Sequence, residues 1–262
     1  MLLSEKFLSH SFFRDPENED GLRHCHPETL YRLAGLMVPP FVVVALVFAA
    51  AGLYLGLFAA PGDTPLGEVY RIAFIHVPAS WMSMLIYLAM TLCAGIGRAF
   101  DAPVAAMTAR ALAPTGAMFT FLGLWTGCLW SKPVWGLWWI GDLEFYSELM
   151  LMLFYSGVIA LHTAMNDPRR ADRACVPMAF TGLVWVPLNF ASVQSWSVEH
   201  AGTAFGFAGA PGLGFISPTG MLAMSLGFFA YTGAMTLLRL RCVILENERQ
   251  SDWMARCAEK PL

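Results

Sequence analysis

Residues 130–148 read Trp-Ser-Lys-Pro-Val-Trp-Gly-Leu-Trp-Trp-Ile-Gly-Asp-Leu-Glu-Phe-Tyr-Ser-Glu and separate two long apolar runs of the chain. Four of the nine tryptophans fall in this stretch, together with Pro133, Gly136 and Gly141, which interrupt helices. An interfacial belt is the simpler interpretation, because tryptophan favours the boundary between lipid head groups and hydrocarbon. Three rings within five residues exceed what a belt needs, and glycines let a flat ligand approach the backbone. We predict a loop at a membrane edge that presents an aromatic shelf.

Composition places the chain among integral membrane proteins. Its 262 residues are 57% hydrophobic and 13% charged, and the mean hydropathy is +0.55. The apolar share lies well above that of an average soluble domain. The formal net charge of -3 favours neither a nucleic-acid partner nor a polybasic lipid anchor. Because the apolar segments follow one another with short polar breaks, we expect one bundle rather than several domains.

Six apolar segments have about the 20 residues that an α-helix needs to cross the hydrocarbon core. They cover residues 35–60, 72–97, 111–130, 148–165, 175–193 and 220–240, and the fourth is short enough to extend back into 145–147. The expected fold is an all-α membrane protein with a bundle of six transmembrane helices in residues 35–240. A polar tail, residues 1–34, precedes the bundle, and a second tail, residues 241–262, follows it.

Lys and Arg predict the orientation of this bundle. If the helices alternate in direction, only Arg71 and Lys132 fall on one side, and thirteen or fourteen of the sixteen basic residues fall on the other. Cytoplasmic loops are enriched in Lys and Arg. We therefore expect both termini in the cytoplasm and the Trp-rich loop, residues 130–148, on the exoplasmic side.

Two histidines fall on the same predicted face as the Trp-rich loop. His76 lies just inside the second apolar segment, and His200 lies in the Gly-rich connection before the sixth. Taken singly, His76 reads as a neutral imidazole bonded to a backbone carbonyl and His200 as an exposed loop residue. An ionisable residue at a membrane boundary is also a functional hypothesis. Two imidazoles beside an aromatic shelf suit a large planar cofactor with a metal centre, since haem iron takes axial histidine.

The sequence lacks the motifs of the common enzyme and metal sites. The sequence contains no GxxxxGK, HExxH or GxSxG motif, and its cysteines lack CxxC spacing. His24-Cys25-His26 in the N-terminal tail has no further ligands nearby. The acids at 142, 144 and 148 read as solvated charges or helix caps, with Glu148 after Ser147 as the cap. We expect no enzyme.

Three further motifs lie in order along the chain. They are Tyr70-Arg71-Ile72 with Ile75-His76-Val77-Pro78-Ala79, then Ala113-Pro114-Thr115-Gly116-Ala117 with Phe119-Thr120-Phe121, and finally Trp196-Ser197-Val198-Glu199. Together with the Trp-rich stretch, Asp142 and Ser147-Glu148-Leu149, they resemble the haem-handling membrane proteins of cytochrome c maturation, most closely the heme exporter protein C family. The resemblance covers nearly everything except the N-terminal tail.

The resemblance implies a carrier that binds haem at the outer face of the bacterial inner membrane and passes it to a haem chaperone. His76 matches the first axial ligand of the haem iron, and His200 is a candidate for the second. The haem platform comprises Trp135, Gly136, Trp138, Trp139 and Asp142. The cargo is transiently bound haem (heme b). The implied partners are the subunits of an ATP-binding-cassette transporter, a small single-span membrane subunit and the lipid bilayer.

Three positions depart from the family pattern. Gly141 stands where the last Trp of the platform is expected, and Phe205 stands where the second axial histidine is expected. Phe cannot ligate iron, so His200, five residues earlier, is the candidate substitute. Glu144 stands where the family tends to place a basic residue that could pair with a haem propionate, which an acid would repel.

Other functions stay open at this stage. A diverged docking subunit that no longer binds haem is favoured by Gly141 and Phe205. A haem lyase shares the Trp-rich motif, but lyase chains are generally longer and have more spans. A small-molecule transporter fits least, because none of the six segments is plainly split by a Gly or Pro break at the midplane with ionisable residues.

Overall fold

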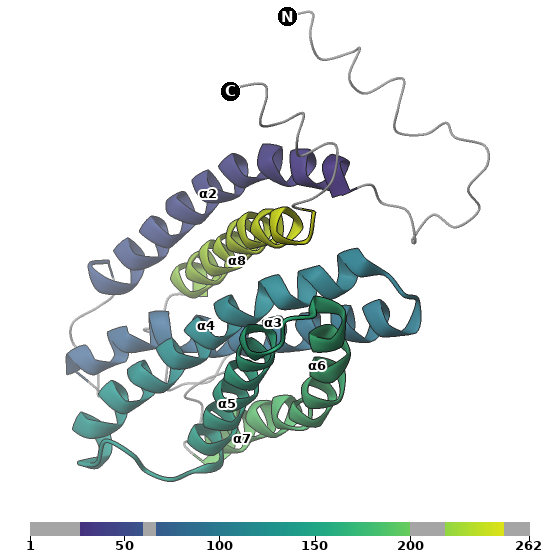
Figure 1. The fold of residues 1–262 in the computed structure, drawn as a ribbon. Helices are drawn as coiled ribbons and strands as arrows, with labels where there is room; N and C mark the ends of the chain where they lie inside the picture. Colours follow the sequence, from purple (N-terminus) through teal and green to yellow (C-terminus); the bar gives the residue numbers. More distant parts are fainter. Residues whose placement is uncertain (1–26, 60–66, 200–217, 249–262) are drawn as a thin grey trace, which may run out of the picture.

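The computed structural model describes residues 27–59, 67–199 and 218–248, and the regular structure of these ranges is entirely helical (Figure 1). The helices are α2 (Pro27–Leu57), η1 (Gly67–Ile72), α3 (Ala73–Ala99), α4 (Pro103–Trp135), α5 (Leu143–Ala164), α6 (Pro168–Gly182), α7 (Trp185–Glu199) and α8 (Pro218–Asn247). Within the described ranges, six helical spans are long and apolar enough to cross a membrane. The prediction of an all-α fold with six such spans is confirmed.

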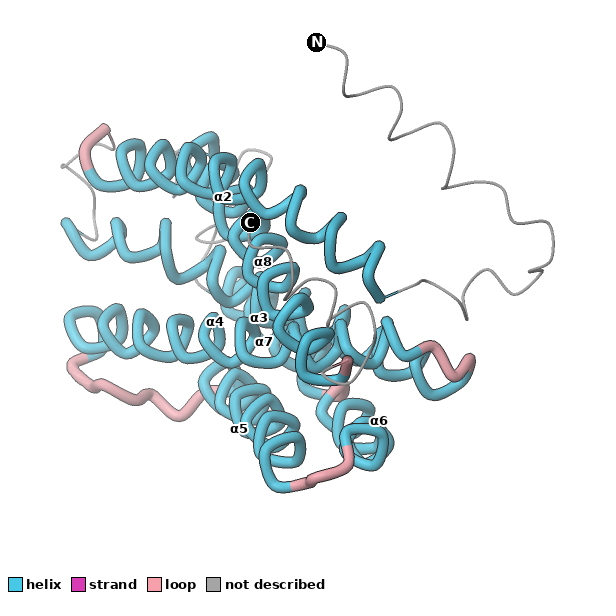
Figure 2. The backbone as a smooth tube through the Cα atoms, turned by 45° about the horizontal axis from the view of Figure 1, so that its top comes forward, coloured by secondary structure: helices cyan, strands magenta, loops and turns pink. Residues whose placement is uncertain are grey.

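The helices are arranged around a central pair, α3 and α4. Figure 1 shows α2 packed along α8 on one side of this pair, and α5, α6 and α7 on the other. Figure 2 shows the connection between α4 and α5 at one end of the bundle, with the α3–α4 and α5–α6 connections at the opposite end. The bundle therefore has two distinct ends, and the Trp-rich segment belongs to the first.

Glycines bring α2 and α8 into close contact. A Cβ added at Gly52 would lie 2.7 Å from the backbone nitrogen of Met224, and one added at Gly227 would lie 2.6 Å from that of Ala49. Small residues of this kind let apolar helices approach closely where no hydrophobic force drives them together in lipid. The opposite face of α2 carries exposed apolar side chains such as Leu36 and Leu46, as expected for a surface in contact with lipid or a partner helix.

The core lies among α3, α4, α5 and α6, where tyrosine rings pack against glycine. The buried ring of Tyr155 lies over Gly116, where an added Cβ would be 2.1 Å from the ring, and its hydroxyl donates to the carbonyl of Ser83 over 2.8 Å. Tyr87 contacts Tyr155 with ring centroids 5.0 Å apart. This packing fixes α5, which carries much of the candidate site, against α3 and α4.

Several helix ends differ from the predicted spans. The third helix begins at Pro103 instead of 111 and continues to Trp135, and the fourth begins at Leu143 instead of 148. Residues 130–135 and 143–148 are thus helical, and only 136–142 connect the two helices. Pro133 lies in the last turn of α4, where it removes one backbone N–H that would otherwise bond to the preceding turn.

The fifth span is divided between two helices, and the two residues between them, 183 and 184, are apolar. Helix α6 ends at Gly182 and α7 begins at Trp185, and both fall within the span Pro168–Ser192. Pro187 gives a physical reason, because its ring would clash with the carbonyl of residue 183 in a continuous helix. In the first turn of a new helix, by contrast, its missing N–H costs nothing.

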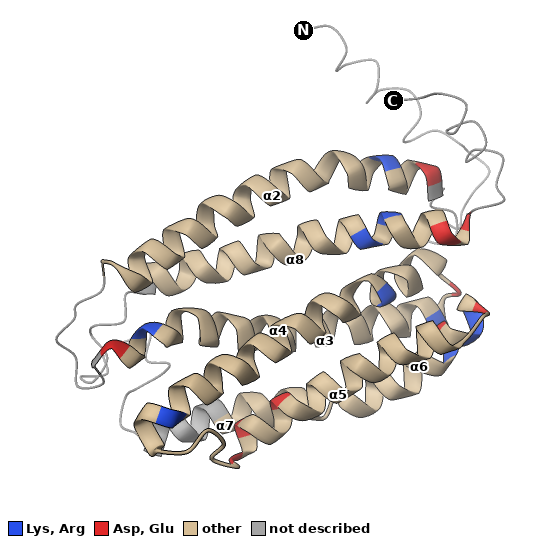
Figure 3. Cartoon of the chain, turned by 60° about the vertical axis from the view of Figure 1, so that its left-hand side comes forward, with Lys and Arg blue, Asp and Glu red and all other residues tan. Residues whose placement is uncertain are grey.

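Charge is distributed unequally between the two ends of the bundle. Figure 3 shows most described Lys and Arg residues toward the end where α5 meets α6, and few toward the α4–α5 connection. The start of α2 lies at the same end as the close of α8, because Arg241 stacks on the ring of Tyr31 at 4.3 Å. This separation of charge fits the predicted orientation, and the side that faces the cytoplasm stays a prediction.

Candidate functional site

The connection between α4 and α5 begins with a turn that requires glycine. Gly136 ends α4 in the left-handed region, with φ of 78°, and its N–H donates to the carbonyl of Lys132. The ammonium of Lys132 donates in turn to the carbonyl of Gly136 over 2.9 Å and lies 5.8 Å from the centre of the Trp138 ring. Lys132 therefore fixes both the end of α4 and one ring of the predicted platform.

Asp142 closes the same connection by capping α5. Its side chain accepts the backbone N–H of Phe145 over 3.0 Å, as an N-cap residue does. Burial raises the pKa of the Asp142 carboxyl, and the bond from Phe145 partly opposes this rise. The sequence assigned the cap to Glu148, and this was wrong, because Glu148 lies inside α5 and is buried.

The tryptophans of the predicted platform are largely uncovered. Trp135, Trp138 and Trp139 are 44%, 56% and 38% exposed. Trp139 is held by two aromatic neighbours, with its ring 4.7 Å from that of Phe145 and 5.8 Å from that of Tyr146. Rings of this size on one short connection leave an apolar surface that a flat ligand could cover.

Gly141 has a local reason to replace the expected tryptophan. Its φ is 69°, in the left-handed region that side chains other than glycine rarely adopt. An added Cβ there would lie 3.6 Å from the Tyr146 hydroxyl and 3.8 Å from Nε1 of Trp139. The turn itself therefore favours glycine, and the space beside it is occupied by the side chains that hold Trp139.

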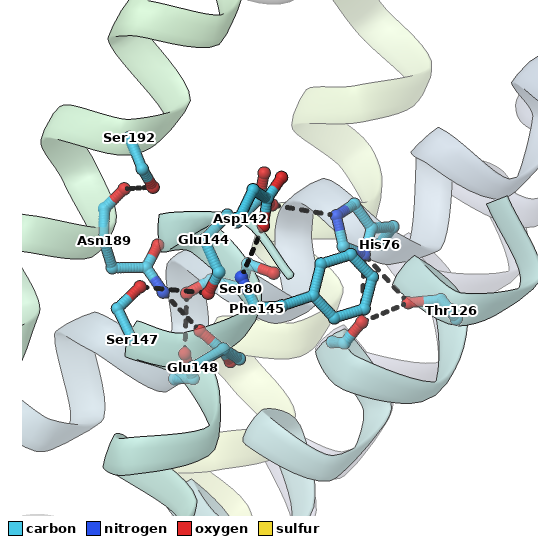
Figure 4. A network of polar contacts seen from close by, with 12 residues as sticks. His76, Ser80, Thr126, Asp142, Glu144, Phe145, Ser147, Glu148, Asn189 and Ser192 are labelled. Carbon is cyan, nitrogen blue, oxygen red and sulfur yellow. Dashed lines mark hydrogen bonds and ion pairs between the residues drawn. The ribbon is translucent and has the colours of Figure 1, made fainter. Parts of the chain in front are cut away.

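His76 lies in the first turns of α3 with its ring fixed by α4 (Figure 4). Its Nδ1 lies 3.1 Å from the carbonyl oxygen of Gly123 and 3.0 Å from the hydroxyl oxygen of Thr126. The Thr126 hydroxyl donates to the carbonyl of Leu122 over 2.6 Å, so it accepts at Nδ1. These partners assign the proton to Nδ1, and the neutral imidazole then has its lone pair on Nε2.

Nε2 of His76 faces the first turn of α5. It lies 3.3 Å from Oε1 of Glu144, and the two side chains are 21% and 24% exposed. A hydrogen bond between these atoms needs a proton from one of the two groups. Iron at Nε2 would displace both that proton and the Glu144 carboxylate.

His76 and the Trp-rich connection meet at Gly127. A Cβ added at this glycine would lie 3.3 Å from Cε1 of His76 and 3.3 Å from Cζ of Phe145, so both rings pack against the same point of α4. Phe145 in turn contacts Trp139. The structure thus brings His76 and Trp139 together with one ring between them. His200 and Phe205 lie outside the described residues.

A buried polar pair lies beneath His76, and the sequence did not predict it. Asn189 of α7 donates from Nδ2 to Oε2 of Glu148 over 2.7 Å, and both residues are buried. A Cβ at Gly123 would lie 3.0 Å from Oε1 of Glu148, so the glycine whose carbonyl contacts His76 also abuts this carboxyl. Asn189 lies seven residues after Gly182, within an apolar run that gives no sign of its partner.

Comparisons with known proteins cover nearly the whole chain. A family model described as heme exporter protein C matches residues 22–255, which include all described helices. The heme exporter protein C of Escherichia coli strain K12 is 38% identical over 231 residues, 87% of this chain and 92% of that protein. That of Haemophilus influenzae is 32% identical over 236 residues, 90% of this chain and 96% of that protein. A putative cytochrome c biosynthesis ccmC-like mitochondrial protein of Marchantia polymorpha is 33% identical over 197 residues, 75% of this chain and 83% of that protein.

Proposed function

The chain belongs to the heme exporter protein C family, and on this premise we propose that it is a haem carrier of the bacterial inner membrane. It binds haem b as cargo at the outer face and delivers it to a haem chaperone during the maturation of c-type cytochromes. The cargo is handed over without covalent change by this chain, which acts as a carrier and not as an enzyme. Its six membrane-capable spans support a multi-pass location in the bilayer.

The observation that carries the proposal is the fixed ring of His76. Its Nδ1 is held by Gly123 and Thr126, which leaves Nε2 to bind a metal at the end of the bundle that carries the Trp-rich connection. Histidines that ligate metals usually donate their other ring nitrogen to a carbonyl or carboxylate in this way. The residues present therefore fit an axial bond to haem iron.

The platform supplies the remaining contacts to the porphyrin. Haem would cover the exposed rings of Trp135, Trp138 and Trp139, with stacking worth ~0.5–1.5 kcal/mol per ring beyond apolar burial. Gly136 lets the plane approach the backbone, and Asp142 holds the far end of the connection by capping α5. His200 stays the predicted second ligand, and weak ligation there would favour release.

Release of haem also requires a chaperone that receives it and further subunits that form the exporter complex. The family supports partners among other subunits of a haem exporter, and we propose an ATP-binding-cassette transporter and a small single-span subunit as these partners. The apolar outer face of α2, with exposed Leu36 and Leu46, offers a surface for lipid or for such a helix.

The absorption spectrum of detergent-purified protein from haem-replete cells tests the proposal. We expect a Soret band in the wild type that is lost in His76→Ala and shifted or lost in His200→Ala. His24→Ala, which removes a histidine of the N-terminal tail, is the matched control and should keep the band. A wild type without haem, even in cells that lack the chaperone, would refute the carrier and leave a docking subunit of the exporter.

A further inference from the structure

A cavity lies at the end of the bundle opposite the Trp-rich connection. It has a volume of about 540 Å³ and is enclosed by the end of α3, the start of α4, the end of α5 and the start of α6. This is the end at which Figure 3 shows most of the described basic residues. The cavity shares no lining residue with the candidate haem site.

The cavity has an apolar interior and a charged mouth. Met90, Val158 and Ala179 line it and are almost fully buried, whereas Arg98 and Arg169 line it from exposed positions. Met90 lies eight residues before Arg98 on the same helix, a distance of about 12 Å along the axis. A ligand that fills the cavity would therefore need one apolar part and one polar part.

The mouth of the cavity carries more positive than negative side chains. Four arginines (Arg98, Arg110, Arg169 and Arg173) and two aspartates (Asp101 and Asp172) line the cavity, so the lining residues have a formal charge of +2, which falls to +1 when the partner of Arg110 is counted. Arg110 is paired with Glu246 over 2.8 Å. Within the described ranges, Arg98, Arg169 and Arg173 form no ion pair. Arginine recognises carboxylate and phosphate groups through its planar fork of donors.

His162 adds a buried polar group to the cavity wall. Its side chain is only 8% exposed, and its Nε2 lies 3.7 Å from Oδ1 of Asp172. Its Nδ1 is buried and has no hydrogen-bond partner among the described residues. Buried polar atoms are rarely left without a partner.

We propose that this cavity binds an anionic amphiphile, with its acidic head group at Arg98, Arg169 and Arg173 and its apolar body along Met90 and Val158. Two candidate ligands combine an acidic group with an apolar body in this way. One is an anionic phospholipid, bound through its phosphate, and basic pockets between transmembrane helices are known to hold such head groups. The other is haem, bound through its two propionates. The haem identity rests on the proposed function, and the phospholipid identity does not.

The test compares two double variants that remove the same charge from the same end of the bundle. Arg98→Gln/Arg169→Gln removes two arginines that line the cavity. Arg32→Gln/Arg170→Gln is the matched control, because neither residue lines the cavity and each pairs with an acid on its own helix or at its cap. Melting of both variants in detergent without added ligand shows that they fold.

The phospholipid arm measures melting temperature against added phosphatidylglycerol, with phosphatidylcholine as the neutral comparison. We expect phosphatidylglycerol to stabilise the wild type and the control variant. Arg98→Gln/Arg169→Gln should need at least about tenfold more lipid for the same shift, because each arginine makes a charge-assisted contact. Added phosphatidylcholine should change the melting temperature of all three proteins equally.

The haem arm titrates haemin into the His76→Ala/His200→Ala background, which removes both predicted outer ligands. A Soret band that persists there, shifts with His162→Ala and is lost with Arg98→Gln/Arg169→Gln identifies haem as the ligand. A response in the phospholipid arm alone identifies the phospholipid. If the cavity variant equals the control in both arms, the proposed site is refuted, whatever the outcome at His76.

Discussion

Glu144→Ala is predicted to tighten haem binding, although it removes a polar side chain from the edge of the candidate site. If haem iron binds Nε2 of His76 as proposed, the Glu144 carboxylate would compete with it, because Oε1 lies 3.3 Å from that nitrogen. A hydrogen bond to a charged group contributes ~1.5–3 kcal/mol when buried, and an exposed ion pair ~0.2–1 kcal/mol. Side chains 21% and 24% exposed place this contact between the two, at ~1 kcal/mol. The dissociation constant for haem should therefore fall about fivefold.

The assay is a haemin titration of detergent-purified protein at fixed pH, followed by the Soret absorbance. Glu68→Ala is the matched control, because Glu68 is an exposed acid at the same end of the bundle and pairs with Arg71. It should leave the dissociation constant within about twofold of the wild type. The loss of an acid from the first turn of α5 costs ~0.3–1 kcal/mol of stability, so melting is measured separately. An unchanged or weaker affinity in Glu144→Ala would refute competition at Nε2.

Three further variants test the supporting structure. Thr126→Val removes one acceptor of the His76 Nδ1 proton and should weaken haem binding by up to about tenfold, with Thr126→Ser restoring it; unchanged affinity would show that Thr126 does not orient the ring. Gly141→Trp restores the residue expected from the family and should still destabilise the protein by ~1–2 kcal/mol, because φ there is 69°; an unchanged melting temperature contradicts this. Asn189→Leu should cost ~1–3 kcal/mol by leaving the buried Glu148 carboxyl without its donor, and Glu148→Met in the same chain should recover most of this loss; no recovery would show that the pair is not the cause.

Hydropathy predicted the number of membrane-capable spans because a membrane fixes a minimum length of apolar sequence. It could not predict where the helices end, since backbone hydrogen bonds continue past the apolar stretch wherever a cap or a neighbour supports them. Helix α4 extends to Trp135 because Gly136 supplies the left-handed turn there, and α5 begins at Leu143 because Asp142 caps it. Pro187 was a visible sign of the break in the fifth span, but a window average over apolar residues conceals it.

The candidate site was predicted in part for a similar reason. His76 and the tryptophans stand out by residue type and by their place at one membrane edge. The partners that fix them do not, because Gly123 and Thr126 look like ordinary residues of an apolar helix. Which face of α4 meets His76 depends on how α3 packs against it, and no pattern within one helix contains that information. Likewise, no pattern in the sequence indicated that Glu148 lies inside α5, where it accepts a hydrogen bond from Asn189 of α7.

The departures at Gly141 and Glu144 fit a carrier better than they fit a protein that has lost its cargo. A carrier must bind haem tightly enough to collect it and weakly enough to pass it on, and a difference of 1.4 kcal/mol changes the affinity tenfold. On the proposed function, one ring fewer on the shelf and one carboxylate at Nε2 of His76 would each lower the affinity for haem by about that amount or less. Both act at the rim of the site and leave untouched the bonds from Gly123 and Thr126 that fix the ring. These bonds fix the His76 ring whether or not haem binds, so the Soret band of the wild type beside that of His76→Ala decides between a carrier and a docking subunit.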